Sequence, residues 1–374
     1  MPDKVRKFIY ELQYNFVFLQ SLKRTLTMED INPRNINSFM KLVAEAVNPV
    51  IVTHAKPDGD AIGSSVAMYH FLRMTGKDNV RIILNDRYPD YLDFITEGIP
   101  EEHLMTNDRH PLLSKNAILG SDLIICLDFH AFHRTKNLEP YLLESRAVKI
   151  LIDHHLNPER GLYEVSFSKT DISSTSELVY QILMRTDVIS GDAGKIPAKA
   201  SLALMTGMTT DTNNFGNSVY PSTLMMASEL LRAGVDRDLI IRKINLEHSE
   251  SRLRLKGHML KDLMNITEDG VAYMILSRKD QIAYRMKEGD TEGFVNEPLS
   301  IADVKMSIFA REDNSEIRIS IRSKKGTSAN RCAGLFFNGG GHENAAGGKL
   351  LMPVGEVEEY IRKHTHIYMT EYEK

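Results

Sequence analysis

The stretch that decides the fold is PVIVTHAKPDGDAI, from Pro49 to Ile62. It opens with a β-branched run that is short enough to be a strand buried on both faces. An acidic turn follows, and then a segment, Ala61 to Met74, whose apolar residues recur near a helical period. The stretch therefore predicts a strand, a polar turn and a helix, which is the first part of a unit that alternates parallel strands with helices.

The same alternation continues along the chain. Further short apolar runs predict buried strands at 80–84, 123–127 and 148–152. Segments with helical spacing follow at 176–184, 198–208, 222–233 and 237–245. We therefore expect an α/β fold with an N-terminal doubly wound parallel sheet.

The rhythm changes near residue 270, where strands are predicted at 271–276, 303–310 and 316–323. In the last of these, isoleucines alternate with Arg318, Ser320 and Arg322, which indicates a half-exposed sheet with basic side chains on one face. A chain of 374 residues is long enough for two cores. The expected parts are an N-terminal helical extension (1–40), a catalytic domain (41–250), a connecting helix (251–267, with its helical pattern from Ser251 to Ile266) and a smaller α/β domain (268–374).

Composition excludes several classes of protein. A hydrophobic share of 42% with 26% charged residues is that of an ordinary globular chain. The net charge of −4 argues against binding to long nucleic acid through a broad basic face. The only cysteines, Cys126 and Cys332, are too few for a disulfide framework and fit a reducing compartment.

The segment from Val5 to Leu22 has apolar residues at helical spacing, interrupted by charges and followed by no signal-cleavage site. We expect an amphipathic helix that packs on the body of the protein or on a second copy in a homodimer. No run of 18 apolar residues occurs, so no bilayer-spanning helix is expected. A cytoplasmic location follows as the default expectation.

Acidic residues and histidines recur where apolar segments end. His54, Asp58 and Asp60 follow the first predicted strand, Asp128 the third, and Asp153-His154-His155 the fourth, while Asp211 closes a later apolar segment. The carboxyl ends of parallel strands share one crevice, so these side chains are expected to converge. Such a cluster without a cation would be costly, which implies metal. Carboxylate and imidazole ligands without thiolate suit Mn²⁺, with Mg²⁺ and Zn²⁺ as alternatives, and two ions can clamp a phosphoryl transfer.

Each residue also has an interpretation without metal. Asp58 and Asp60 could form a turn that caps the helix at Ala61. Asp128 could be a strand-end cap, and His54 an ordinary hydrogen-bonded histidine. The segment Asp171–Glu177 opens a helix with hydroxyl caps, and capping alone accounts for it, so no site is assigned there. Only the conjunction at several strand ends favours metal.

These motifs resemble the DHH phosphoesterases. Asp153-His154-His155 is similar to the signature motif of that family, His54-x-x-x-Asp58-x-Asp60 to its first motif, Asp128 to its second and Asp211 to its fourth. The resemblance extends over about residues 45–350. It implies that His54, Asp58 and Asp128 hold one ion, and that Asp60, Asp128, His154 and Asp211 hold the other. It further implies that His155 lies beside the scissile phosphate and that Asp153 orients the histidine pair.

The sequence departs from the family pattern at Asn213, which stands where the family has glycine. Asparagine tolerates a left-handed backbone, so the turn is expected to survive. His130 and His133 are additional histidines that we leave out of the metal list.

The segment NGGGHENAAGG, from Asn338 to Gly348, is the second strong signal. Consecutive glycines let backbone N–H groups converge on an anion, although a flexible loop is the commoner explanation. The segment resembles the phosphate-binding loop of the DHHA1 domain, which implies substrate contacts from Gly339, Gly340, Gly341 and His342. Arg322 matches the substrate-binding arginine of that domain, and its guanidinium can bind a phosphate with two parallel bonds. Asn338 stands where a fourth glycine is usual.

The pairing of a DHH with a DHHA1 domain resembles the stand-alone oligoribonuclease and 3'-phosphoadenosine 5'-phosphate (pAp) phosphatase group. The resemblance implies a hydrolase that degrades short oligoribonucleotides to mononucleotides and also converts pAp to AMP. The alternative is a phosphodiesterase of cyclic di-AMP or its linear product pApA. A non-enzymatic nucleotide-binding protein is a third interpretation. Structural metal sites are normally closed and rich in cysteine, unlike the predicted site, which argues against this interpretation.

Overall fold

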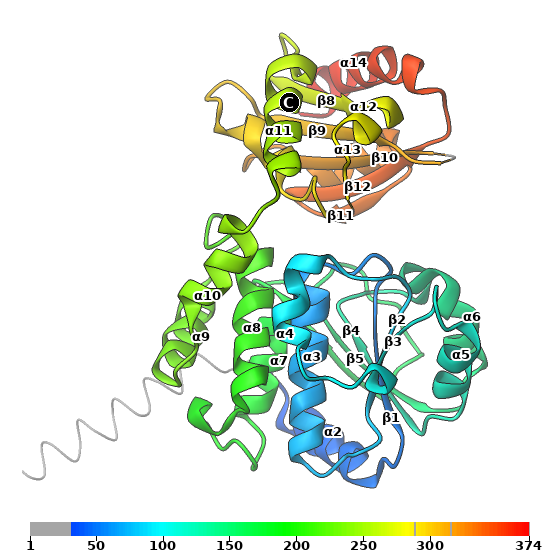
Figure 1. Ribbon diagram of the computed structural model, residues 1–374, viewed down its shortest axis with the longest axis vertical. Helices are drawn as coiled ribbons and strands as arrows, with labels where there is room; N and C mark the ends of the chain where they lie inside the picture. The colour runs from blue at the N-terminus through cyan, green and yellow to red at the C-terminus, as the bar shows by residue number, and fades with distance from the viewer. Residues whose placement is uncertain (1–30, 288, 315, 374) are drawn as a thin grey trace, which may run out of the picture. The chain divides into compact units, whose positions relative to one another are not determined.

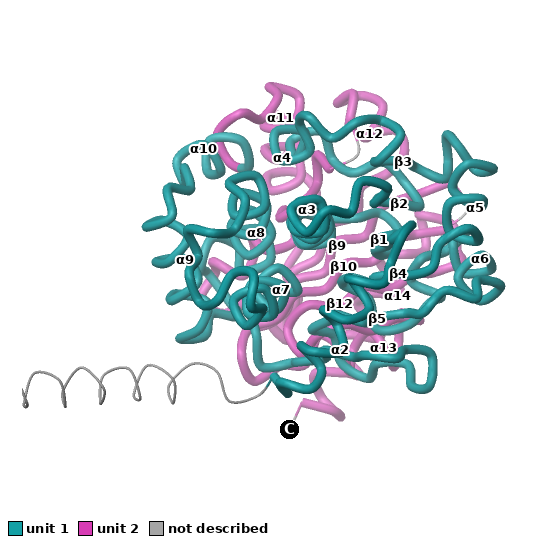
Figure 2. The backbone as a smooth tube through the Cα atoms, turned by 90° about the horizontal axis from the view of Figure 1, so that it is seen from below, with its two compact units in different colours: residues 1–244 teal, residues 245–374 magenta. Residues whose placement is uncertain are grey.

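The computed structural model describes residues 31–287, 289–314 and 316–373. The predicted helix at Val5 to Leu22 lies outside these residues. The chain forms two compact units, which divide between Ile244 and Asn245 (Figure 2). The expected α/β class is confirmed, because each unit contains a six-stranded sheet with helices (Figure 1).

The sheet of the first unit is parallel throughout, with the strand order β3-β2-β1-β4-β5-β6. This is the order of a doubly wound sheet, and its switch point lies between β1 and β4. The strands are β1 (Pro49–Thr53), β2 (Arg81–Leu84), β3 (Leu104–Thr106), β4 (Leu123–Leu127), β5 (Val148–Asp153) and β6 (Val165–Ser168).

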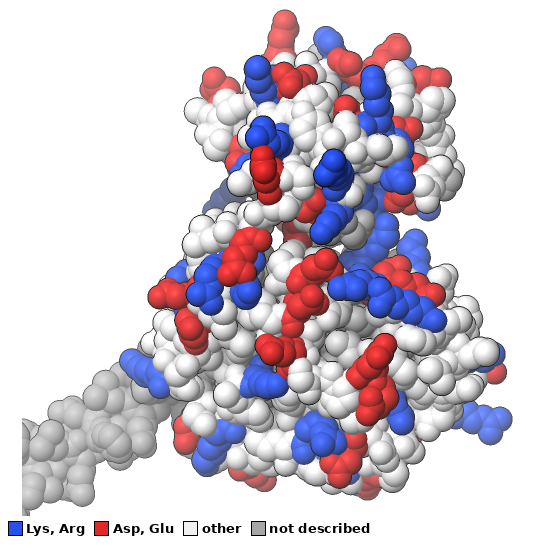
Figure 3. All heavy atoms as spheres, in the orientation of Figure 1, with Lys and Arg blue, Asp and Glu red and all other residues white. Residues whose placement is uncertain are grey.

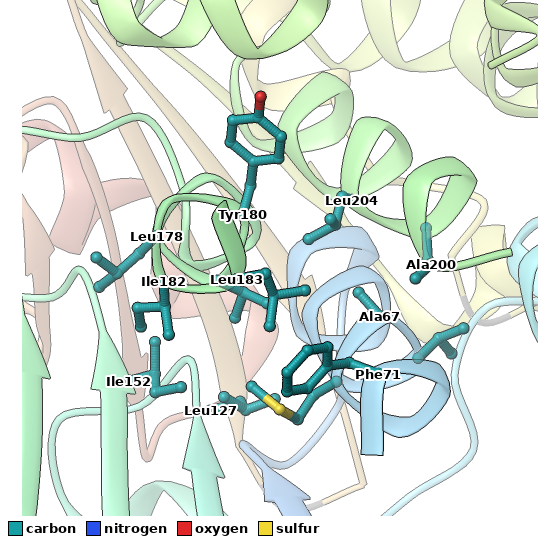
Figure 4. Packing of buried hydrophobic residues seen from close by; sticks show 14 of the residues in the cluster. Ala67, Phe71, Leu127, Ile152, Leu178, Tyr180, Ile182, Leu183, Ala200 and Leu204 are labelled. Carbon is teal, nitrogen blue, oxygen red and sulfur yellow. The ribbon is translucent and has the colours of Figure 1, made fainter. Parts of the chain in front are cut away.

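Helices cover both faces of this sheet. They are α2 (Pro33–Glu45), α3 (Gly59–Met74), α4 (Asp93–Thr96), α5 (Pro111–Leu119), α6 (Glu139–Glu144), α7 (Thr175–Met184), α8 (Ala198–Asp211), α9 (Pro221–Arg232) and α10 (Arg237–Ile241). The core that includes α2, α3, α7, α8 and α9 packs on one face of the sheet, and α5 and α6 pack on the other. Figure 4 shows Leu127 and Ile152 from the sheet beneath Phe71 and Ile182 from the helices.

The central strands are buried on both faces because alternate residues enter the two cores. Ile51 and Ile125 belong to the larger core, whereas Val50 and Ile124 belong to the core beneath α5 and α6. The α3 helix contacts both α7 and α8, and nearly every residue of its first three turns is buried. This burial holds the first turn of α3 rigidly beside the end of β1.

The second unit contains a mixed sheet in the order β11-β12-β10-β9-β8-β7, in which only β8 and β9 pair in parallel. Its strands are β7 (Asn265–Ile266), β8 (Val271–Leu276), β9 (Met306–Glu312), β10 (Ile317–Ser323), β11 (Gly340–His342) and β12 (Ala345–Leu350). Its helices are α11 (Glu250–His258), α12 (Arg278–Ala283), α13 (Ala329–Phe336) and α14 (Val357–Ile367).

The two faces of the second sheet differ. Ile317, Ile319 and Ile321 of β10 pack in a core with α13 and α14. On the other face, a smaller cluster that includes Leu255 of α11 and Phe309 of β9 covers the part formed by β8 and β9. Arg318, Ser320 and Arg322 share this second face and are half-buried, as the alternation in the sequence predicts.

One predicted helix is partly wrong. The segment Ser251–Ile266 contains α11, then a wider helical turn at Met259–Leu263, and ends in the short strand β7. The strand forms because Asn265 and Ile266 pair with Tyr273 and Ala272 of β8, so a sheet edge overrides the helical spacing.

Neither cysteine forms a disulfide, and both are buried. Within the described part of the chain, no helix has the length and hydropathy needed to cross a membrane. Basic and acidic side chains are interspersed on the face drawn in Figure 3, in keeping with the small net charge.

Candidate metal centre and substrate-binding residues

The predicted site residues of the first unit follow the strands at its switch point. His54 comes directly after β1 and Asp128 directly after β4, while Asp153 ends β5 and His154 follows it. Because β1, β4 and β5 are adjacent and parallel, their carboxyl ends bring these side chains to one edge of the sheet.

The first group of possible ligands consists of His54, Asp58 and Asp128, each of which offers an atom within 4.8 Å of the others. His54 Nε2 lies 3.4 Å from Asp128 Oδ2 and 3.8 Å from Asp58 Oδ1. His54 Nδ1 lies 3.0 Å from the carbonyl of Ala55. A carbonyl only accepts, so Nδ1 carries the proton of that bond and the ring presents Nε2 to the carboxylates.

Asp58 has the capping role considered above as well as a place in this group. Its Oδ1 accepts hydrogen bonds from the backbone N–H groups of Asp60 and Ala61, each at 3.1 Å, and so caps α3. The capping interpretation is therefore confirmed, and it does not exclude a role in metal binding, because the capping oxygen Oδ1 also lies 3.8 Å from His54 Nε2 in the first group.

The second group consists of Asp60, Asp128 and His154, all buried and again with atoms within 4.8 Å of one another. His154 Nε2 lies 3.5 Å from Asp128 Oδ1 and 3.9 Å from Asp60 Oδ2. Asp211, the last residue of α8, places Oδ2 3.6 Å from the same His154 nitrogen. All six residues expected to bind metal therefore lie at one place.

Asp128 belongs to both groups, and its two oxygens face different histidines. Oδ2 faces His54 and Oδ1 faces His154. The residue has φ = +63°, a conformation that is uncommon outside glycine but tolerated by aspartate. Its backbone N–H donates to the carbonyl of Ile152 at 3.1 Å, which ties it to β5. The uncommon backbone is thus held where the carboxylate lies between the two groups.

The electrostatics of the site call for added positive charge. Burial raises the pKa of Asp60 well above its usual value, and the negative charges of Asp128 and Asp211 raise it further. Burial also acts to raise the pKa of Asp128, but a hydrogen bond from His54 and the charges of His155, His54 and His154 outweigh it, so the pKa of Asp128 is lowered. One carboxylate is thus balanced by histidines and the other is not, which fits a cation beside Asp60.

Asp153 contacts His155, one of the two histidines that the resemblance implies it orients. His155 Nδ1 lies 2.7 Å from Asp153 Oδ1 and 3.7 Å from Asp128 Oδ1. The ring of His130 lies 5.9 Å from that of His155 between centroids, and His133 lies 5.7 Å from His130. Among the described residues, neither His130 nor His133 belongs to a group that could hold a metal ion.

Two glycines allow the helices around this site to pack closely. A Cβ atom on Gly59 would lie 2.3 Å from Thr210 Oγ1, so the start of α3 touches the end of α8 beside Asp211. A Cβ atom on Gly207 would lie 2.0 Å from Ser176 Oγ and 3.0 Å from Asp60 Oδ1. The three helices therefore meet at Asp60 through positions that accept no side chain. Beyond α8, Asn213 has φ = +47°, so the expected left-handed turn is present.

Sequence reasoning missed one contributor, the start of α7. The predicted cap is present, since Ser174 Oγ accepts the N–H of Glu177 at 3.0 Å. In addition, Thr175 and Ser176 donate hydrogen bonds to Asp60 and Asp128. The available signal was the run of four hydroxyl residues, Ser173 to Ser176, because capping requires only one of them.

In the second unit, Arg322 and His342 lie in one row of the sheet. Both pair with Ala345 of β12, one from each side, so their side chains point to the same face. The segment Gly340–His342 forms the edge strand β11, and the expectation of a loop there is wrong. The N–H of Gly341 donates to Asn330 Oδ1 at 2.8 Å. A Cβ atom on Gly339 would lie 1.8 Å from the carbonyl oxygen of Gly347, so close strand packing explains that glycine.

Two family models match the chain. The N-terminal domain of the DHH family matches residues 48–208, and the DHHA1 domain matches residues 258–363. These ranges fall in the first and second units respectively.

Individual relatives cover most of the chain. The bifunctional oligoribonuclease and PAP phosphatase NrnA of Thermus thermophilus is 31% identical over 83% of this chain and 88% of its own length. The solved structure of an exopolyphosphatase-related protein from Bacteroides fragilis is 38% identical, with a TM-score of 0.83 over 91% of this chain and 98% of that one. The cyclic-di-AMP phosphodiesterase PdeA of Listeria monocytogenes is 24% identical over 63% of this chain and 35% of its own length.

The first unit is a doubly wound domain with aspartates and histidines at its switch point, and the second is a smaller mixed-sheet domain. Together they define a class of two-domain α/β proteins with a histidine–aspartate centre. The chain belongs to the DHH family of phosphoesterases, and its second unit contains a DHHA1 domain.

Proposed function

We propose that the chain is a metal-dependent hydrolase that degrades short oligoribonucleotides to mononucleotides and also removes the 3'-phosphate of pAp. The observation that carries the proposal is the arrangement of Asp128, whose two oxygens face two separate groups of ligand side chains. A carboxylate in this position is suited to bridge two cations.

The donor set fits two divalent ions. His54, Asp58 and Asp128 would hold one ion, and Asp60, Asp128, His154 and Asp211 the other. Oxygen and imidazole ligands suit Mn²⁺, with Mg²⁺ as the alternative. Bound there, the ions would supply Lewis-acid stabilisation to the oxygens of a phosphate ester. The buried Asp60, with its raised pKa, supports this assignment because a nearby cation stabilises its ionised form.

His155 and Asp153 would act on the substrate side of the centre. We propose that His155 donates a hydrogen bond to the scissile phosphate through Nε2, since Nδ1 is bonded to Asp153. A buried carboxylate at 2.7 Å holds the imidazole in one orientation. The pair can therefore offer a charge-assisted hydrogen bond to a phosphate oxygen.

Arg322 and His342 would bind a second part of the substrate. Their common row on one face of the second sheet favours contacts with one phosphate or base, with Gly340 and Gly341 beside them. The name of the Thermus thermophilus relative, together with its coverage of most of this chain, supports short RNA and pAp as the substrates.

The two free, buried cysteines fit a cytoplasmic enzyme.

A cyclic di-AMP or pApA phosphodiesterase is the second candidate. The similarity to PdeA favours it, but that similarity covers only 35% of the relative. One assay separates the candidates. The metal-stripped full chain is supplied with Mn²⁺, Mg²⁺ or Zn²⁺ and offered RNAs of two to five nucleotides, pAp, pApA and cyclic di-AMP.

The proposal predicts release of mononucleotides from the RNAs and AMP from pAp, with Mn²⁺ the most effective ion. Turnover of cyclic di-AMP and pApA alone would favour the second candidate. Failure to cleave any RNA with any of the three ions contradicts the leading one.

A further inference from the structure

The start of α7 points into the centre described above. Ser173, Ser174, Thr175 and Ser176 are all buried, with at most 1% of their surface exposed. Four consecutive buried hydroxyl residues are unusual, since each hydroxyl needs a partner away from water. The partners of this hydroxyl segment, residues 173–176, include two of the carboxylates of the centre.

Asp60 accepts two backbone hydrogen bonds from the segment. The N–H of Thr175 donates to Oδ2 at 2.7 Å, and the N–H of Ser176 donates to Oδ1 at 2.8 Å. These N–H groups belong to the first turn of α7, where no intrahelical acceptor is available to them. Each carboxylate oxygen of Asp60 is thereby fixed by a different donor, so its side chain cannot rotate freely.

Asp128 accepts a hydrogen bond from the side chain of the same segment. Thr175 Oγ1 lies 2.9 Å from Asp128 Oδ1, the oxygen that faces His154. The other oxygen, Oδ2, faces His54. The Thr175 hydroxyl therefore fixes the oxygen of Asp128 that faces the second group of ligands.

Glu177 supports the segment from behind. Its buried Oε2 accepts hydrogen bonds from Ser173 Oγ at 2.5 Å and Thr223 Oγ1 at 2.7 Å, and Oε1 accepts one from Gln181 at 3.1 Å. Thr223 lies in the first turn of α9. One carboxylate thus joins the segment, α7 and α9, which makes the segment a rigid mount.

We propose that Thr175 is a positioning residue for the bridging carboxylate, and that the hydroxyl segment pre-sets Asp60 and Asp128 for the second ion. The inference rests on the metal centre of the proposed function but not on the identity of the substrate. Residues that orient metal ligands in this way change metal affinity or activity by about 10- to 100-fold when they are replaced.

The test compares three variants of the full-length chain. Thr175→Val keeps the shape of the side chain and removes the hydroxyl, whereas Thr175→Ser keeps the hydroxyl. Thr206→Val is the matched control, because Thr206 is also buried, on α8, and its hydroxyl donates to the carbonyl of Leu202 at 2.8 Å. Mn²⁺ affinity and stoichiometry are measured by calorimetry on metal-stripped protein, and folding by circular dichroism.

We expect wild type to bind two ions. In Thr175→Val the affinity for one ion should fall by about 10- to 100-fold, while circular dichroism and the other ion are unchanged. Thr175→Ser should retain affinity within about threefold, since it restores the donor, and Thr206→Val should bind as wild type does. If the role of Thr175 were purely structural, Thr175→Val would lower the affinity for both ions together or lower the folded fraction. Thr175→Ser would then show no recovery.

Equal affinities in wild type and folded Thr175→Val would overturn the inference. If Thr175→Val does not fold, the comparison of Thr175→Ser with Thr175→Ala decides, and a loss of affinity in both contradicts the role of the hydroxyl. Because the readout is metal binding, the result is independent of whether RNA is the substrate. A wild-type chain that binds no divalent ion overturns the centre itself, and with it this inference.

Discussion

His54 Nε2 lies 3.4 Å from Asp128 Oδ2, and both side chains are buried. Burial lowers the pKa of His54, but the hydrogen bond with Asp128 and the charges of Asp58 and Asp128 outweigh burial and raise it to about 9. Without a cation, the protonated histidine thus supplies positive charge to the carboxylates. A divalent ion takes over that role only if His54 releases its proton, because metal ligation uses the neutral ring.

The metal-free protein should therefore lose stability as the pH rises. The folded-state pKa of His54 is raised above the unfolded value of 6.5, so its contribution is fully present below pH 6.5 and is lost as the pH rises through about 9. Asp60 acts in the same direction, because its raised pKa makes the native state bind more protons than the unfolded state above pH 3.8. Urea unfolding with a chelator at pH 6, 7.5 and 9 measures this trend.

Metal binding should reverse the trend and release protons. At pH 7.5, addition of Mn²⁺ to the metal-stripped chain should release at least a large fraction of one proton, which calorimetry in two buffers of different ionisation enthalpy detects. His54→Gln is the control, and it should release less. Proton release of the same size in His54→Gln, or a chelated protein that gains stability toward pH 9, contradicts the assignment.

Replacement of Asp128 by asparagine should strongly reduce hydrolysis and spare the fold. Asparagine tolerates the left-handed backbone at this position, where φ is +63°, and it still offers an oxygen to the Thr175 hydroxyl. The lost charge removes a ligand shared by the two ions. The ions would stabilise the transition state by several kcal/mol, so kcat should fall by about a hundredfold or more. Activity and near-ultraviolet circular dichroism are measured together. A folded Asp128→Asn protein with more than a tenth of wild-type activity would show that Asp128 is not the bridge.

The central strands could be predicted from the sequence because they are buried on both faces. The runs at Pro49–Thr53 and Leu123–Leu127 match β1 and β4 to the residue, since continuous apolar runs of this length have few other uses. The edge strands β3 and β6 were not predicted. β3 has only three residues, and β6 alternates buried and exposed residues over four. Such edge strands form because they pair with a neighbouring strand. The sequence of a short segment carries little sign of that pairing.

The candidate site divides in the same way. Residues that follow central strands, such as His54 and Asp128, could be placed together because parallel strands end at one edge. Thr175 could not, since its part in the site depends on how α7 packs against α3 and α8. The edge strand at Gly340–His342 was also missed. A glycine-rich segment is expected both where strands pack closely and where a loop binds phosphate, so its composition does not distinguish the two.

Gly207→Ala should damage the centre through packing alone. The added methyl group would lie 2.0 Å from Ser176 Oγ and 2.9 Å from Ser176 Cβ, so the start of α7 must shift away from α8. Overpacking of this kind costs about 1–3 kcal/mol of the free energy of unfolding. The displaced N–H groups of Thr175 and Ser176 should also weaken Mn²⁺ binding. Urea unfolding and calorimetry measure the two effects.

The control for this variant is Gly257→Ala on α11, where a Cβ atom meets nothing within 4 Å. Alanine in an open helical position should be neutral or stabilising by about 0.5–1 kcal/mol, with unchanged Mn²⁺ affinity. If Gly207→Ala binds Mn²⁺ as tightly as wild type, the packing of α7 does not affect metal binding and the prediction is contradicted.

Arg322→Ala should weaken substrate binding more than it slows the chemical step. Arg322 shares a row and a face of the second sheet with His342, whereas Arg318 lies on the same face four residues earlier, about 13 Å away along the strand. A hydrogen bond to a charged group contributes about 1.5–3 kcal/mol, or roughly 10- to 100-fold in affinity. We therefore expect KM for pAp and dinucleotide RNA to rise by that factor in Arg322→Ala, with kcat changed by less than about threefold. Arg322→Lys should recover only part of the loss, because an ammonium group cannot bind a phosphate with two parallel bonds. Arg318→Ala is the matched control and should leave KM within about twofold. Equal rises in KM for Arg318→Ala and Arg322→Ala would indicate a general charge effect of this sheet face and contradict a specific phosphate contact at Arg322.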